Sequence, residues 1–238
     1  MKKIKIYLCM VVMIIFVVGI TMFINKEEYS YYLVLGDYIS NKQVLNNEQI
    51  TSFSSLVGEY LKEEKVVNEV SSGYIKNNMT SKKLLEMIES DSYKINDSSL
   101  VDLIKKSKYI SISLGINDII NQVKYDSYKN EIVYDKDVID SKIQIFKHNY
   151  HQVLQEIQDI NKDSKVILVG CYNLYGDNQI SNLLNNAIKE VASDFEAIYV
   201  DVSDINDKYM YQDNELYLTS FGQEIISKKV IGLINKQA

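Results

Sequence analysis

The sequence predicts a three-layer α/β sandwich, in which helices cover both faces of a five-stranded, mainly parallel sheet. Short apolar or β-branched runs alternate with longer segments whose apolar residues recur at helical spacing, from about residue 31 to the C-terminus. The hydrophobic and charged fractions, 46% and 24%, are those of a globular protein. Alternation of strands and helices indicates a parallel sheet buried on both faces, flavodoxin-like in general form.

Five runs are predicted to be strands, because each is apolar or alternating and is bounded by polar residues or glycine. They cover residues 31–35, 65–70, 109–114, 165–170 and 197–202. In sheets of this kind, ligands bind where the carboxyl ends of the strands meet the loops that follow. The residues directly after each strand are therefore the candidates for a functional site.

Helical patterns occupy the gaps between these strands. The longest is predicted to begin near Asp137, and six of its apolar residues form one face: Ile139, Ile143, Phe146, Tyr150, Leu154 and Ile157. Residues 80–88, 180–195 and 221–234 show similar patterns. The polar stretch 122–137 is predicted to be a surface excursion, and neither an internal repeat nor a second folded domain is indicated.

The N-terminus predicts a membrane anchor. Lys2, Lys3 and Lys5 precede the apolar run 6–24, which is long enough to cross a bilayer at about 1.5 Å per residue. Basic residues before such a run indicate a cytoplasmic N-terminus and an exported C-terminal domain. A cleaved signal peptide is the alternative, although the run is long and no small-x-small cleavage site follows it.

We therefore expect residues 1–25 to anchor the chain in the cell membrane and residues 26–238 to form one extracytoplasmic domain. The net charge is −6 and no basic stripe is present, so nucleic acid is not an expected partner. Cys9 and Cys171 are not placed to pair, and Cys171 is interpreted as a small buried apolar residue. No cluster of Cys, His and Asp has metal-ligand spacing, so neither a metal nor another cofactor is expected.

Three polar motifs stand at the expected functional edge. GDYIS occupies residues 36–40 after the first strand, GIND occupies 115–118 after the third, and NELYLTSFG occupies 214–222 before the final helix. Their order and spacing resemble the SGNH/GDSL hydrolase family, which has GDS, GxND and DxxHxNxxG at these three places. VGCYN, at residues 169–173, also resembles the exit of the fourth strand in Gram-positive members. The resemblance covers nearly the whole exported region and implies that family's fold.

The resemblance also implies ester hydrolysis, which needs a Ser nucleophile, a His base, an Asp that orients the His, and an oxyanion hole. Carried over residue by residue, it leaves no catalytic set intact. Tyr38 stands at the nucleophile position, Tyr217 at the His position and Asn214 at the Asp position. Tyr38 is a poor substitute, because a phenol with a pKa near 10 is ionised in only about one molecule per thousand at pH 7.

The oxyanion hole is also incomplete in this alignment. Its glycine corresponds to Asn78, with Gly73 nearby as the other alignment, while Asn117 is retained. The only histidines, His148 and His151, fall in the long predicted helix, with His148 about 16 Å from its start and away from the site. We expect the family's catalytic positions to line one cleft: Asp37, Tyr38, Asn78, Gly115, Asn117, Asn214 and Tyr217.

Each of these residues also has a purely structural interpretation. Gly36 and Asp37 suit a strand-to-helix turn, Asn117 suits a helix cap, and Tyr38 and Tyr217 suit a role as fillers of a vacated cleft. Two tyrosines and two asparagines around one cleft also suit a sugar- or peptide-binding surface. Whether Tyr38 and Tyr217 close the cleft distinguishes these interpretations.

The sequence thus predicts a catalytically inactive pseudoenzyme that acts as a binding or scaffold module at the cell envelope. Its partner would be an envelope glycan, lipid or protein. One alternative is an active esterase or acyl hydrolase of envelope glycans or lipids, which works through an altered catalytic set. The other is a fold that holds a partner and leaves its cleft unused.

Overall fold

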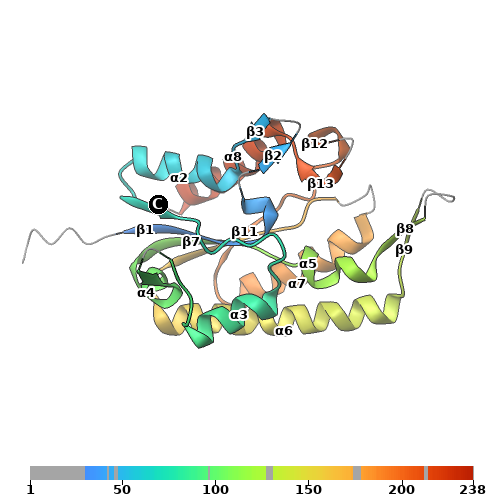
Figure 1. Ribbon diagram of the computed structural model, residues 1–238, viewed down its shortest axis with the longest axis horizontal. Coiled ribbons are helices and arrows are strands. Elements are labelled where there is room, and N and C mark those ends of the chain that lie inside the picture. The colour runs from blue at the N-terminus through green and yellow to red at the C-terminus, as the bar shows by residue number, and fades with distance from the viewer. Residues whose placement is uncertain are drawn as a thin grey trace, which may run out of the picture.

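A computed structural model describes residues 30–41, 43–45, 48–95, 97–126, 131–173, 178–211 and 214–237. Its centre is a five-stranded sheet in the order β11–β10–β7–β1–β4, and all of its strands run parallel (Figure 1). The strands are β1 (Tyr31–Gly36), β4 (Glu69–Ser71), β7 (Ser107–Ser113), β10 (Lys165–Val169) and β11 (Ile198–Val200). The predicted sheet is confirmed, and its order is that of the flavodoxin-like folds.

Helices cover both faces of this sheet (Figure 1). On one face α2 (Phe53–Glu63) packs against α8 (Ser220–Lys236). On the other face α6 (Lys136–Ile160) lies between α3 (Ser81–Ser90) and α7 (Asn178–Asp194) and also contacts the short α4 (Leu100–Lys106). The predicted apolar face of α6 is buried along its whole length.

Shorter elements decorate the loops. The described residues form four antiparallel hairpins: β2 (Gln43–Leu45) with β3 (Glu48–Ile50), β5 (Lys94–Ile95) with β6 (Ser98–Ser99), β8 (Lys124–Asp126) with β9 (Glu131–Val133), and β12 (Met210–Tyr211) with β13 (Asn214–Leu218). Single turns of helix are η1 (Tyr38–Ser40), α5 (Ile116–Ile119), η2 (Ile120–Gln122) and η3 (Asp207–Tyr209). The predicted excursion at 122–137 contains the β8–β9 hairpin and the start of α6.

The predicted strand at 65–70 is wrong over its first four residues. The backbone of Lys65 has φ 56°, and the N–H groups of Val66 and Val67 donate to the carbonyl of Leu61 at 2.8 and 3.2 Å. These bonds cap the C-terminus of α2. Val67 is buried, so an apolar capping turn imitates the pattern of a strand, and β4 begins only at Glu69.

No helix within the described ranges is both long enough and apolar enough to span a membrane. The predicted anchor at residues 1–25 lies outside the described residues, so the membrane span stays a prediction.

Gly36, at the end of β1, makes the closest backbone approach at the functional edge. Its φ is +135°, a region that L side chains rarely adopt, and an added Cβ would lie 2.3 Å from the carbonyl oxygen of Ser113. The next residue, Asp37, donates its backbone N–H to the same oxygen at 3.1 Å. Only glycine therefore lets the ends of β1 and β7 meet at this distance.

We predict that Gly36→Ala lowers the free energy of unfolding by about 3 kcal/mol or more, because it combines a positive φ with a backbone clash. Gly232→Ala is the matched control. Gly232 is exposed on α8 with nothing within 4 Å of an added Cβ, so this change should raise stability by up to about 1 kcal/mol. Urea unfolding followed by circular dichroism measures both changes, and equal effects would contradict the argument.

Candidate functional site

Asp37 is the buried centre of the edge at which β1 and β7 end. Its Oδ1 accepts a hydrogen bond from the backbone N–H of Ile39 at 3.1 Å and a longer one from the Ser113 hydroxyl at 3.5 Å. Its Oδ2 accepts from Nδ2 of Asn117 at 3.3 Å. The bond from Ile39 caps η1, so this carboxylate shapes the turn on which Tyr38 stands. Burial raises the pKa of Asp37 to about 7, and the charge of Asp118 adds to this rise.

Asn117 links the loop after β7 to two other loops. Besides its bond to Asp37, its Nδ2 donates to the carbonyl of Asn77 at 3.2 Å. An amide nitrogen carries two N–H groups, so these two acceptors account for both. In this arrangement the side-chain amide has no N–H left to stabilise an oxyanion.

Asp118, the next residue, attaches α3 to the same edge. Its carboxylate accepts from the backbone N–H of Ser81 at 3.1 and 3.2 Å and from the Ser81 hydroxyl at 2.5 Å. A carboxylate at a helix N-terminus satisfies unpaired N–H groups and opposes the positive end of the helix dipole. Burial raises the pKa of Asp118, while its bonds to Ser81 lower it.

Tyr38 and Tyr217 come from distant segments, and the structure brings them together. Their ring centroids lie 5.5 Å apart at an interplanar angle of 57°. Tyr38 is only 6% exposed and its hydroxyl oxygen is buried, whereas Tyr217 is half-buried. Burial raises the pKa of Tyr38, and its interaction with the buried Tyr172 raises it further. The Tyr38 hydroxyl is therefore both protonated at neutral pH and closed off from solvent.

The remaining predicted residues have different environments. Asn78 is exposed in the loop before α3, and its carbonyl accepts from Nζ of Lys83 at 3.0 Å. Gly115 has φ +126°, and an added Cβ would lie 3.1 Å from Leu184 and 3.3 Å from Phe146. Asn214 is the first residue of β13, and its side chain lies outside what the structure describes.

The two histidines of the chain lie on α6, as predicted. His148 is exposed, and the ring of His151 packs edge-on against Phe195 with centroids 4.6 Å apart. Phe195 precedes β11, so this contact lies toward the amino ends of the strands. The His151 ring is thus packed at the edge opposite Tyr38.

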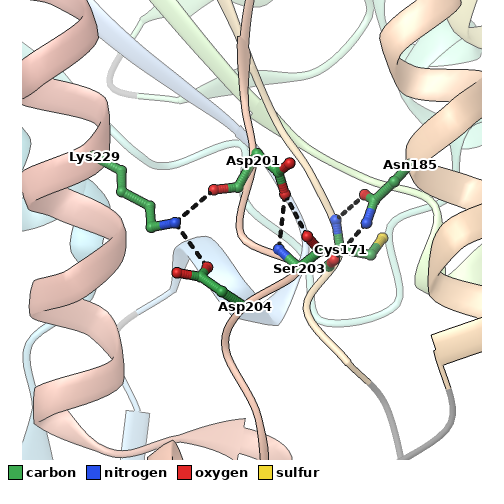
Figure 2. A network of polar contacts seen from close by, with 6 residues as sticks. All are labelled: Cys171, Asn185, Asp201, Ser203, Asp204 and Lys229. Atoms are coloured by element: carbon green, nitrogen blue, oxygen red, sulfur yellow. Dashed lines mark hydrogen bonds and ion pairs between the residues drawn. The ribbon is translucent and has the colours of Figure 1, made fainter.

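The side chain of Asn185, on α7, forms hydrogen bonds with the backbone of the loop after β10, as Figure 2 shows. Oδ1 of Asn185 accepts from the backbone N–H of Cys171 at 2.7 Å, and its Nδ2 donates to the Cys171 carbonyl at 2.8 Å. Cys171 is buried, as predicted, and burial raises the pKa of its thiol. These two bonds fix the peptide that carries Tyr172 beneath Tyr38.

The loop after β11 is held in a similar way by Lys229 of α8 (Figure 2). Its Nζ donates to the carbonyl of Asp201 at 3.0 Å and to the Asp204 carboxylate at 2.7 Å. Asp201 in turn accepts from the backbone N–H and the hydroxyl of Ser203. This loop leads into η3 and the β12–β13 hairpin that carries Tyr217.

Sequence reasoning missed three residues of this edge: Ser113, Asn77 and Tyr172. Ser113 is buried and its hydroxyl lies 2.6 Å from that of Ser40. A signal existed for Ser113 and Tyr172, because each lies at or just beyond the end of a predicted strand. Asn77 acts through its backbone carbonyl, which no residue-type pattern reveals.

No group of three or more His, Cys, Asp or Glu side chains in the described ranges is arranged to hold a metal ion. At this edge Asn117 and Asp118 are engaged with other groups of the protein.

We predict that the free energy of unfolding falls as the pH rises from about 4 to about 7. Asp37 has a pKa near 7 when folded against 3.8 ordinarily, so the folded state binds its proton more tightly over this range. The upper bound of this effect is about 4 kcal/mol. Asp37→Asn should flatten the pH dependence measured by urea unfolding, and Asp163→Asn, at an exposed loop position, should not. An unchanged slope in Asp37→Asn would contradict the prediction.

The comparisons with known proteins agree with this architecture. Residues 35–225 match the GDSL-like Lipase/Acylhydrolase family. A lipase from a goat rumen metagenome has a similar structure, with a TM-score of 0.68 and 20% identity over 85% of this chain and 96% of that one. A lipase/acylhydrolase from Enterococcus faecalis has a TM-score of 0.58 and 15% identity over 87% of this chain and 96% of its own.

The psychrotrophic esterase EstA from Pseudoalteromonas sp. is also similar, with a TM-score of 0.59 and 16% identity over 88% of this chain and 98% of that one. At these identities the structures show the fold alone. No curated protein sequence matches the chain. The matched segment contains all three motifs and the start of the last helix, and the chain therefore belongs to the GDSL-like lipase/acylhydrolase family.

Proposed function

We propose that this protein is a membrane-anchored, extracytoplasmic member of its family that does not hydrolyse esters and acts as a binding or scaffold module at the cell envelope. The observation that carries the proposal is the position of Tyr38. It occupies the family's nucleophile position with a buried hydroxyl whose pKa is raised, and Tyr217 packs over it. A protonated phenol without access to solvent cannot attack an ester carbonyl.

The histidine that serves as general base in the family is also missing beside Tyr38. His148 and His151 are the chain's only histidines, and both lie on α6 away from this edge. General-base catalysis is typically worth about 10²–10⁴-fold. Asn117 stands at the oxyanion position with both of its N–H groups already donated, and one lost oxyanion donor typically costs about 10²–10³-fold.

An active esterase with an altered catalytic set is the alternative. The feature that favours it is a chain of polar groups in which the Ser40 hydroxyl contacts that of Ser113, which donates to Asp37. A serine linked to a carboxylate with a pKa near 7 is a plausible nucleophile and base. However, Ser40 is 1% exposed, so no substrate reaches it unless η1 moves.

We predict no esterase turnover above background from the purified domain on short acyl esters or acetylated glycans. Tyr38→Ser alone should not restore activity, because the new hydroxyl has no His to take its proton. Tyr38→Ser, Asn214→Asp and Tyr217→His together should give weak turnover if the cleft opens. The release of p-nitrophenol from its short acyl esters and the release of acetate from acetylated glycans measure the activity of all three proteins.

Two results would instead establish the altered catalytic set. Hydrolysis by the unmodified protein that Tyr38→Phe abolishes would make the Tyr38 hydroxyl a participant. Hydrolysis that survives Tyr38→Phe and is lost in Ser40→Ala would assign the reaction to Ser40. Retention of the native circular dichroism spectrum in each variant is the control for folding.

We also predict that protease added to intact spheroplasts digests the domain. The motivation is the set of Lys2, Lys3 and Lys5 before the apolar run 6–24, which favours export of everything that follows. Immunoblotting with an antibody against the domain measures the digestion. Full protection until the spheroplasts are lysed would place the domain in the cytoplasm and refute the proposed topology.

A further inference from the structure

Three pairs of lysines lie along the edge of the sheet opposite the candidate site, where the strands begin. Lys62 and Lys65 stand at and just beyond the end of α2, Lys105 and Lys106 end α4, and Lys162 and Lys165 lie between α6 and β10. All are exposed except Lys165, which is half-buried and donates from Nζ to the carbonyl of Gln237 at 3.1 Å. None of the ion pairs found between described residues involves them.

Backbone contacts place these pairs side by side. Nδ2 of Asn161, next to Lys162, donates to the carbonyls of Ile104 and Lys105 at 2.8 and 3.3 Å, which joins the ends of α6 and α4. Tyr31 pairs with Ser107 on one side and with Glu69 on the other. The preceding residue, Ser30, therefore lies between the second pair and the first.

Two cavities open along the same edge. One, of about 310 Å³, has Lys162 and Lys165 in its wall together with Asp163, Glu196 and apolar residues such as Phe195. The other, of about 390 Å³, is lined by Ser30, Lys62 and Lys65 among others. Each cavity thus has two lysines in its wall, and the second is the more favourable for a small anionic group because the described residues that line it include no carboxylate.

The opposite edge carries carboxylates together with lysines, and Lys229 forms an ion pair with Asp204 there. Asp126, Asp135, Asp137, Asp201 and Asp204 lie in or beside the loops that follow β7 and β11. Carboxylates such as Glu63 and Asp163 also lie among the lysines, so the amino-end edge is mixed in charge and not strongly basic. A surface of anionic lipid would nevertheless attract the lysine pairs.

The chain connects to the predicted anchor at this same lysine-bearing edge. Ser30 is held there by bonds with Asn68, whose Oδ1 accepts from the Ser30 N–H at 2.7 Å and whose own N–H donates to the Ser30 carbonyl at 3.0 Å. It lies five positions after residue 25, and even a fully extended chain of five steps spans only about 18 Å. Strand β1 alone is about 20 Å long. The site edge therefore cannot turn to face the bilayer at the end of so short a tether.

We propose that the three lysine pairs bind the phosphate headgroups of anionic phospholipids in the membrane that anchors the chain, and that the candidate site faces away from this membrane. The inference rests on the anchoring given under Proposed function. Because the tether holds the domain close to the surface, weak contacts suffice for a stable orientation. It follows that the site edge meets polymers or proteins beyond the membrane and not the lipids of its own bilayer.

The test uses the full chain in vesicles of phosphatidylcholine with or without phosphatidylglycerol, and a quencher attached to the lipid headgroups. A maleimide fluorophore is placed at Gln158→Cys, on α6 beside the first cavity, or at Val133→Cys, which is 44% exposed on β9. The chain has two native cysteines, so Cys9→Ser is included to prevent labelling at position 9. Cys171 is buried and is not expected to react with the maleimide. We expect several-fold stronger quenching at position 158 than at 133, and a larger difference in the anionic vesicles.

Charge variants then test the lysines themselves. Lys62→Gln, Lys65→Gln, Lys105→Gln, Lys106→Gln, Lys162→Gln and Lys165→Gln together should remove the effect of lipid charge, and the triple variant Lys105→Gln, Lys106→Gln and Lys162→Gln should reduce it. Substitution of Lys124, Lys136 and Lys208 by Gln, the control for the triple variant, should leave the effect unchanged. Equal or stronger quenching at position 133, or a response to lipid charge that survives the sixfold variant, would overturn the inference. Extraction by alkaline carbonate separates the two proposals: a released protein refutes the anchor, while a retained protein with the wrong quenching pattern refutes only the orientation.

Discussion

The hydrogen bonds of one buried carboxylate, that of Asp37, hold the functional edge of this protein together. Gly36 lets β1 approach β7 so closely that the Asp37 N–H donates a hydrogen bond to the Ser113 carbonyl. The Asp37 carboxylate in turn accepts hydrogen bonds from Ile39, Ser113 and Asn117. Burial is the largest cause of the rise in its pKa. A carboxyl group kept from water favours its protonated form, so the junction is held by hydrogen bonds more than by charge.

The same contacts support the proposal that this edge has a structural role in place of a catalytic one. An oxyanion hole needs donors that point into empty space, and a nucleophile needs an exposed atom. Here Asn117 donates to Asp37 and Asn77, the Tyr38 hydroxyl is buried, and Tyr217 packs against the Tyr38 ring. Polar groups that would serve a reaction are satisfied by one another, and an aromatic ring occupies the place where a small nucleophile would stand.

The two edges of the sheet differ in their connection to the rest of the chain. Three lysine pairs line the amino ends of the strands, where the chain enters the domain at Ser30. Hydrogen bonds with Asn68 fix Ser30 at the amino ends of the strands. Since the apolar N-terminal run ends only a few residues before Ser30, this edge must lie close to the predicted anchor. An anchored domain of this shape presents its family site outward, which relates the proposed binding role to partners beyond the membrane.

The sequence by itself determined the strand–helix alternation, the burial of α6, the five-stranded parallel sheet and the family, because apolar periodicity and ordered motifs are local properties of the chain. It misplaced the start of β4, because the helix cap at Lys65 has the same apolar pattern as a strand. Only the tertiary structure decided how the motif residues meet. The stacking of Tyr38 on Tyr217, the use of both Asn117 donors and the rise of the Asp37 pKa depend on distances between segments up to 180 residues apart. Such distances follow from the packing of the whole sheet, which no stretch of sequence encodes alone.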